Sequence, residues 1–312
     1  MGPLMIDVAG ETLADEEREM LAHPAVGGVI LFARNCRLPA QIRHLVASIR
    51  SAAGRPLLVA IDQEGGRVQR MRAGFSRLPP ARALGEAYDL DPAAARAKAR
   101  ARGRLLALEL AAVGIDFSFA PVLDVDYGRS AVIGDRALHG NPEVVADLAL
   151  AFAAGARADG MACVAKHFPG HGWAVADSHK EMPSDSRDYA LIRSDLLPFQ
   201  RMVDDGVEAV MTAHIHYAAV DKATPCYSPR WLQQELRERM GFAGAIFSDD
   251  LSMHGAAQAG GLRERAAAAL AAGCDMLPIC NNPEGVRELL GSWTAAAPRS
   301  AEERLAALRR AG

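Results

Sequence analysis

The chain has 312 residues, of which 50% are hydrophobic and 23% charged, and a chain of this composition buries a core instead of remaining disordered. Its formal net charge of −3 predicts neither nucleic acid nor an anionic membrane as a partner. Its five cysteines are odd in number and include no C-x-x-C, which argues against a disulfide framework or a zinc ribbon. No signal peptide and no apolar run of about 18 residues is visible, so we expect a cytoplasmic protein.

Short apolar runs alternate with longer helical patterns along the whole chain. We expect strands at residues 4–8, 27–32, 57–61, 116–120, 162–166, 208–213, 244–248 and 274–278. Several of these runs are almost continuously apolar, which is typical of strands buried on both faces. Helices are predicted at 39–54, 92–114, 142–160, 194–206, 229–241 and 261–273, and in two segments after 283. The charges of 95–104 are spread around the second of these helices, which indicates that they are solvated.

Eight strand–helix units predict a (β/α)8 TIM-type barrel that occupies residues 1–312 as a single domain. A doubly wound open sheet is the alternative. Two connections, 62–92 and 167–192, are long for either fold, and long loops in compact domains usually serve function.

Titratable residues follow the predicted strands although the strands themselves are apolar. In a barrel, the carboxyl ends of the strands carry the active site. The residues at these positions are Asp62, Asp124, Lys166, His167, His214 and Asp249. A structural ion pair explains any one of them well, but together they favour a shared site.

Asp249 lies in "FSDDLSM", where a carboxylate at the mouth of a barrel could attack an electrophilic carbon. Capping of the next helix is the alternative for this aspartate. The neighbouring Asp250 is expected to point elsewhere, because adjacent residues near a strand end face opposite sides. In "IDQEGGRVQR" (61–70), a carboxylate and arginines around a Gly-Gly turn suit a polyhydroxylated ligand, or else form surface ion pairs.

The stretch "KHFPGHGWAVADSH" (166–179) combines three histidines with two glycines and a proline. We expect a loop at about 168–180 that carries acid/base chemistry. Asp177 could accept a hydrogen bond from His179 and raise its basicity, which gives a dyad able to exchange protons near neutral pH. A zinc site built from these histidines and "HIH" (214–216) is the competing interpretation.

Four blocks in this order, "IDQEGGRVQR", "FAPVLDV", "KHFPGHG…DSH" and "FSDDLSM", resemble the bacterial β-N-acetylhexosaminidases of glycoside hydrolase family 3. The resemblance runs from "GPLMIDVAG" to about residue 280, and it is closest to the cytosolic enzymes of peptidoglycan recycling. It implies a retaining enzyme that removes terminal β-linked N-acetylglucosamine from 1,6-anhydromuramoyl peptides, without a cofactor or metal. One departure from the family pattern is Trp173, where many members carry a smaller or polar residue.

By position in these motifs, Asp249 matches the nucleophile, His179 the general acid/base and Asp177 its partner. The sugar-binding positions of the family correspond to Asp62, Arg70, Arg136, Lys166 and His167. The resemblance implies a saccharide or muropeptide as the only partner, and we expect a monomer.

Three other functions remain open from the residues alone. A metal-dependent amidohydrolase would use "HIH", and a non-catalytic sugar-binding protein would not need Asp249 or His179. A phosphorylase is compatible with a histidine acid/base, since a histidine does not repel phosphate as a carboxylate would.

Overall fold

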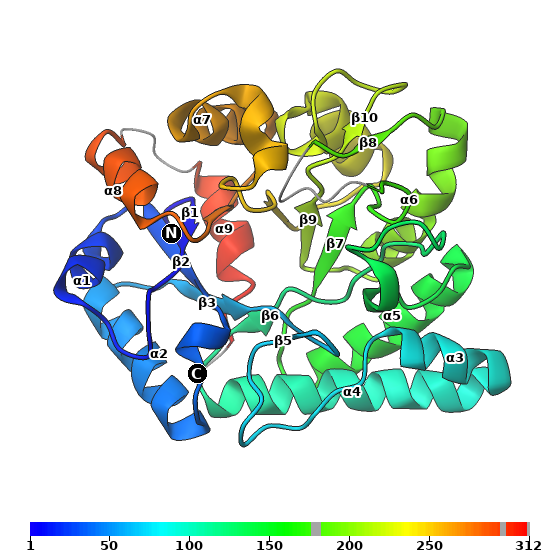
Figure 1. Ribbon diagram of the computed structural model, residues 1–312, viewed down its shortest axis with the longest axis horizontal. Helices are drawn as coiled ribbons and strands as arrows, with labels where there is room; N and C mark the ends of the chain where they lie inside the picture. Colours follow the sequence, from blue (N-terminus) through cyan, green and yellow to red (C-terminus); the bar gives the residue numbers. More distant parts are fainter. Residues whose placement is uncertain (176–181, 294–297, 311–312) are drawn as a thin grey trace.

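A computed structural model describes residues 1–175, 182–293 and 298–310 of the chain. Parallel strands occupy its centre and helices surround them (Figure 1). The central strands are β1 (Leu4–Ile6), β2 (Val26–Leu31), β3 (Leu58–Ile61), β6 (Phe117–Ser118), β7 (Val164–Phe168), β9 (Ala209–Thr212), β11 (Ala245–Phe247) and β12 (Leu277–Ile279). Every predicted strand is therefore confirmed, with bounds that shift by up to a few residues.

These strands pair in two parallel sheets. One has the order β12-β1-β2-β3-β6 and the other has the order β11-β9-β7. Two isolated parallel bridges connect the outer strands of the sheets, Val122 with Lys166 and Phe247 with Met276. The fold is thus α/β with parallel strands, and the carboxyl ends of all these strands point the same way.

All the predicted helices are present, and two further short helices accompany them. The helices are α1 (Asp15–Ala22), α2 (Pro39–Ala53), α3 (Arg82–Leu90), α4 (Pro92–Ala112), α5 (Pro142–Ala158), α6 (Tyr189–Asp204), the π-helix η4 (Arg230–Arg239), α7 (Leu262–Ala272), α8 (Pro283–Gly291) and α9 (Arg299–Ala306). The sequence analysis did not predict α1 and α3. Short 3-10 helices are η1 (Ala33–Asn35), η2 (Gly134–Arg136), η3 (Pro225–Tyr227) and η5 (His254–Ala259).

Helices α4 and α5 approach each other closely because glycines replace side chains at their contact. A Cβ on Gly103 would lie 2.1 Å from the carbonyl oxygen of Phe152, and one on Gly155 would lie 2.0 Å from that of Arg100. Only glycine permits this approach of two backbones. The pair lies beside β6 and β7 on the outside of the strands (Figure 1).

The interior between the strands is filled by side chains. The rings of Phe117, Phe119 and Phe247 are fully buried and pack edge to face, with centroids 5.4–6.0 Å apart. Aromatic rings prefer this arrangement to face-to-face stacking. These packed rings fill the space between the strands near their carboxyl ends.

One prediction for the charged helix is wrong. Arg96 and Arg104 lie on the surface and pair with Asp147 and Asp159, as solvated residues do. Arg102 is buried, however, and donates hydrogen bonds to the carbonyl oxygens of Glu64 and Pro79. It therefore attaches the connection after β3 to helix α4, a contact that helical periodicity alone does not reveal.

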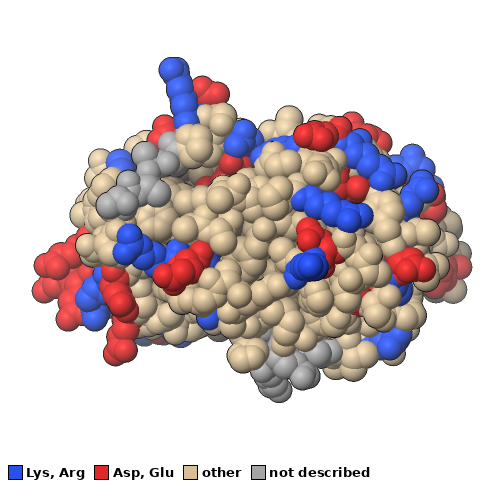
Figure 2. Space-filling model, turned by 90° about the horizontal axis from the view of Figure 1, so that it is seen from above, with Lys and Arg blue, Asp and Glu red and all other residues tan. Residues whose placement is uncertain are grey.

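The surface mixes charges of both signs over most of the face in Figure 2, with an acidic group at one edge. No broad basic field appears on this face. Among the described residues, no helix combines the length and the apolar character that a membrane crossing requires.

The two long connections carry small sheets of their own. The first contains β4 (Gln63–Gly65) paired antiparallel with β5 (Val68–Gln69), followed by α3. The second contributes β8 (Ser184–Asp185), which pairs with β10 (His216–Tyr217) after β9. Both connections thus lie over the carboxyl ends of the central strands.

Candidate active site

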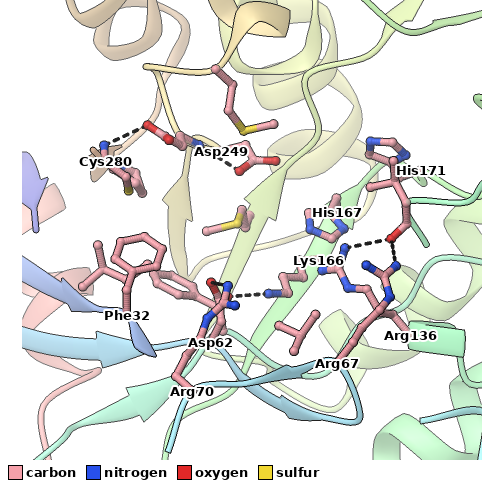
Figure 3. Close-up of a pocket in the computed structure, with 18 of the residues that line it drawn as sticks. Phe32, Asp62, Arg67, Arg70, Arg136, Lys166, His167, His171, Asp249 and Cys280 are labelled. Carbon is pink, nitrogen blue, oxygen red and sulfur yellow. Dashed lines mark hydrogen bonds and ion pairs between the residues drawn. The ribbon is translucent and has the colours of Figure 1, made fainter. Parts of the chain in front are cut away.

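A pocket of about 680 Å³ opens at the carboxyl ends of the parallel strands. Six of the residues predicted from the sequence line it together, and Figure 3 shows them converging from separate strands and loops. These residues are Asp62, Arg70, Arg136, Lys166, His167 and Asp249. The geometry therefore supports a shared site over a set of unrelated ion pairs.

Lys166 is a buried charge in the pocket with two carboxylate partners. Its side chain is almost completely buried, and its Nζ lies 2.9 Å from Oδ1 of Asp62 and 2.7 Å from Oε1 of Glu64. Burial alone would lower the pKa of Lys166, but the two carboxylates outweigh it and raise the pKa above its ordinary value. The ammonium is therefore fixed in place and charged at neutral pH.

Asp62 contacts a second cation, Arg70, through the carboxylate oxygen that Lys166 does not bind. Nη2 of Arg70 lies 3.3 Å from Oδ2 of Asp62. Burial would raise the pKa of Asp62, yet Lys166 and Arg70 hold it below the usual range. A carboxylate held between two donors offers fixed acceptors and donors to a ligand rich in hydroxyl groups.

Arg136 contacts Glu64 in a two-point ion pair. Its Nε lies 2.8 Å from Oε2 and its Nη2 lies 2.8 Å from Oε1 of that glutamate. This arrangement holds the pKa of Glu64 well below its ordinary value although burial opposes it. The sequence analysis did not single out Glu64, and the structure adds it as the anion that contacts both Arg136 and Lys166.

Asp124 organises the start of the segment that follows β7. Its Oδ2 lies 2.7 Å from Nδ1 of His167, and its Oδ1 accepts hydrogen bonds from the backbone N–H groups of His167 and His171. Asp124 is fully buried. The aspartate thus sets both the ring orientation of His167 and the path of the chain around the Lys166–His167 peptide bond, which is cis.

His171 lines the pocket, and its ring packs edge-on against that of His167 with centroids 5.8 Å apart. Its side chain is almost fully buried, and neither ring nitrogen has a hydrogen-bond partner among the described residues. Burial lowers the pKa of His171 to about 4, so the ring is neutral at pH 7. A neutral imidazole has one donor and one acceptor nitrogen, and both of these nitrogens are buried here.

Asp249 lies directly after β11 with one carboxylate oxygen free. Oδ1 accepts the backbone N–H of Asp250 at 2.8 Å, and Oδ2 has no partner among the residues that the structure describes. Burial would raise the pKa of Asp249, but His214, His167, the Asp250 N–H and Lys166 lower it below the ordinary value. The predicted alternative, a cap on the next helix, is not seen, since Met253 is the residue that precedes η5.

Asp250 lines the same pocket as Asp249, but its carboxylate binds backbone groups of the next loop and of the segment after β12. Its Oδ1 accepts the backbone N–H groups of Ser252 and Cys280, each at 2.9 Å. Its carbonyl oxygen lies 3.0 Å from Nε2 of the buried His214. His214 therefore supports the peptide after Asp249 and does not line the pocket.

Two of the predicted catalytic residues, Asp177 and His179, lie outside the described residues. Within the described residues, no group of three or more His, Cys, Asp and Glu side chains is placed to hold a metal ion. The "HIH" histidines separate, because His214 contacts Cys226 and Asp250 whereas His216 lies in β10.

Apolar side chains form other walls of the pocket. Phe32, Phe119, Met211 and Met253 line it. Sequence analysis did not single them out, because their types are those of ordinary core residues. Phe32, Phe119 and Met211 lie at the end of a strand or directly after one, a position that could have indicated them, whereas Met253 precedes η5.

The chain matches the Glycosyl hydrolase family 3 N terminal domain over residues 4–306. It belongs to glycoside hydrolase family 3. The resemblance predicted from the four sequence blocks is thereby confirmed, over a longer span than those blocks covered. As a member of this family, the chain is an enzyme of the glycosidase class.

Similar proteins in this family cover nearly the whole chain. A "Beta-hexosaminidase" of Methylobacillus flagellatus is 52% identical over 94% of this chain and 84% of its own length. One of Methylococcus capsulatus is 55% identical over 92% of this chain and 85% of its own. A crystal structure of NagZ from Neisseria gonorrhoeae in complex with N-trifluoroacetyl-D-glucosamine is 45% identical, with a TM-score of 0.94 over 99% of this chain and 90% of that one.

Proposed function

We propose that this family 3 enzyme is a retaining β-N-acetylhexosaminidase that removes terminal β-linked N-acetylglucosamine from peptidoglycan fragments. The observation that carries the proposal is the convergence of Asp249 with the Asp62–Lys166–Arg70 group in one pocket. The names of the relatives and the sugar derivative bound to the Neisseria gonorrhoeae protein support the choice of sugar.

Asp249 is the nucleophile in this proposal. Its lowered pKa keeps it ionised at neutral pH, and its free Oδ2 attacks the anomeric carbon while the bond to the leaving oxygen breaks. The hydrogen bond from Asp250 to Oδ1 holds the carboxylate in one orientation. The product of this step is a glycosyl ester on Asp249.

The sugar hydroxyls bind to the charged groups at the other end of the pocket. Asp62, Arg70, Lys166 and His167 supply acceptors and donors whose orientations are fixed by Glu64 and Asp124. A site built in this way discriminates against analogues without the matching hydroxyl, because its buried polar groups would then be unpaired.

His179 serves as general acid and then as general base in the proposal, with Asp177 as its partner. The imidazolium donates its proton to the leaving oxygen, and the neutral imidazole then takes a proton from the water that hydrolyses the glycosyl ester. This assignment comes from the "DSH" motif alone.

We also propose that the parallel strands close into a (β/α)8 barrel, in a single domain. The bridges between Val122 and Lys166 and between Phe247 and Met276 support closure, because they connect the outer strands of the two sheets. A cytoplasmic location and a monomeric state remain predictions.

The decisive experiment measures hydrolysis of an aryl N-acetyl-β-glucosaminide by the wild-type protein, Asp249→Ala and His179→Ala, with a chelator present and phosphate absent. We expect turnover by the wild type and a loss of about 10³-fold or more for Asp249→Ala. His179→Ala is expected to lose less on leaving groups that need no proton.

Other outcomes favour the alternative functions. A wild-type protein that is inactive with chelator and restored by metal would favour the metal-dependent hydrolase. Activity that rises strongly with phosphate and yields a sugar phosphate would favour the phosphorylase. Binding of the sugar without any turnover would favour the non-catalytic protein.

A further inference from the structure

A cation–aromatic cluster lies beside the pocket and is not part of the sugar site. The indole of Trp173 lies between two guanidinium groups, that of Arg129 at 4.1 Å and that of Arg187 at 4.7 Å from the ring centroid. Tyr127 packs edge-on against Trp173, with centroids 5.2 Å apart. We call Arg129, Trp173, Arg187 and Tyr127 the Trp173 cluster.

Most charges around the Trp173 cluster are already neutralised. Arg187 is buried and binds both Asp185 and Asp195, each at 2.6 Å from its Nη2. Asp126 on the neighbouring loop pairs with Arg82. Arg187 therefore fixes the position of the indole but has little capacity left for a ligand.

Arg129 differs from these residues because it is exposed and has no carboxylate partner among the described residues. Its contact with the indole face orients the guanidinium without using its N–H donors, since a cation–π contact leaves them available. A guanidinium of this kind is suited to bind a carboxylate in a two-point arrangement.

The Trp173 cluster borders the side of the pocket that lies opposite Asp62 and Arg70. Ala131, Val132 and Val175 line the pocket, and they follow Arg129 and Trp173 by two or three residues. Figure 3 shows Asp62 and Arg70 at one end of the pocket and His171, two residues before Trp173, at the other. If the sugar binds at Asp62 and Arg70, the leaving group extends toward Arg129.

We propose that Arg129, held on the face of Trp173, is a binding site for a carboxylate on the leaving group of the substrate. This inference rests on the proposed glycosidase function and narrows its substrates to glycosides with an anionic leaving group. Because the site is exposed, the preference is modest and decreases as the salt concentration rises.

The test uses two aryl glycosides that differ only in charge, the N-acetyl-β-glucosaminides of para-hydroxyphenylpropanoate and of its primary amide. We expect kcat/KM for the carboxylate to exceed that for the amide by about 2- to 5-fold at low salt, mainly through KM. Arg129→Gln should equalise the two compounds. Arg18→Gln, which removes an exposed arginine of helix α1, is the matched control and should keep the preference.

Equilibrium binding separates this inference from the proposed function. Calorimetric titration of Asp249→Asn with both compounds measures the preference without turnover. Tighter binding of the carboxylate that disappears in Asp249→Asn/Arg129→Gln supports the site even if the wild type cleaves neither compound. Equal affinity for both compounds, or a preference that survives Arg129→Gln, would overturn the inference.

Discussion

Oδ2 of Asp124 lies 2.7 Å from Nδ1 of His167, and Oδ1 of the same carboxylate accepts the backbone N–H of His171 at 2.7 Å. One fully buried aspartate thereby orients two histidines of the pocket. Asp124→Asn keeps the shape but removes the charge, so we expect kcat/KM to fall by about 10- to 100-fold, by analogy with the loss of the carboxylate that orients a metal-bound histidine.

Kinetics on an aryl N-acetyl-β-glucosaminide, together with thermal unfolding, test this prediction. Asp147→Asn, which removes a surface partner of Arg96, is the control and should retain activity. Unchanged kinetics in Asp124→Asn would show that the orientation of His167 does not depend on this carboxylate.

The ammonium of Lys166 lies between the carboxylates of Asp62 and Glu64. Its removal leaves these two carboxylates close together without the cation that they share. We expect Lys166→Met to lower the free energy of unfolding by about 3–5 kcal/mol at neutral pH, the usual cost of breaking a buried ion pair. Acid should restore part of this loss, because Asp62, left with Arg70 alone beside an ionised Glu64, is then protonated more easily, whereas Glu64 stays ionised beside Arg136. Urea unfolding at pH 7 and pH 4 measures both effects, with the exposed Lys98→Met as control. A difference below about 0.5 kcal/mol would contradict the prediction.

Asp250 is expected to make the protein less stable as the pH rises through the acidic range. Burial raises its pKa to about 7, whereas an unfolded aspartate titrates near 3.8. Between about pH 4 and pH 7 the folded state therefore binds more protons than the unfolded state, and stability decreases as pH increases. Above about pH 7 Asp250 is ionised in both states, and its contribution to the free energy of unfolding no longer changes with pH.

Asp250→Asn should remove this loss of stability at high pH, because an amide does not ionise. Its side-chain oxygen can still accept hydrogen bonds from the backbone N–H groups of Ser252 and Cys280. Because the residue is partly exposed, we expect a gain of about 1–3 kcal/mol at pH 8 and almost none at pH 4. Denaturant unfolding between pH 4 and pH 8 measures this gain, with the substitution of the exposed Asp15 in Asp15→Asn as the control. A gain independent of pH would count against ionisation of Asp250 as the cause.

Gly172 lies where no side chain fits. A Cβ at this position would be 1.7 Å from the carbonyl oxygen of Val125. Gly172→Ala must displace the chain next to His171, so we expect destabilisation of about 1–3 kcal/mol and a loss of activity of more than about tenfold. Gly10→Ala, where nothing lies within 4 Å of the added Cβ, should change neither. Thermal unfolding and the aryl glycoside assay together test the pair.

The sequence was most informative where a single physical pattern decided the outcome. Strands buried on both faces need continuous apolar runs, so all the central strands were predicted. The helices α1 and α3 were missed because they are short, with eight and nine residues, and lie within segments that were interpreted as connections. Arg102 was assigned to solvent because periodicity places a residue on a face of its helix but does not indicate what covers that face.

For the site, the sequence by itself determined which residues are available and in what order along the chain. Titratable groups directly after apolar strands indicated Asp62, Lys166, His167 and Asp249, because the carboxyl ends of parallel strands meet at one edge. Their assembly into one pocket is a property of strand order, and only the tertiary structure decides it.

Partners of buried charges were also decided only by the tertiary structure. Glu64 and Asp124 lie 102 and 43 positions before the residues they hold, Lys166 and His167, so no local pattern pairs them. Burial removes solvent from these groups and makes the pairing strong. The contact of Arg129 with Trp173 has the same origin, since it joins two loops that are distant in sequence.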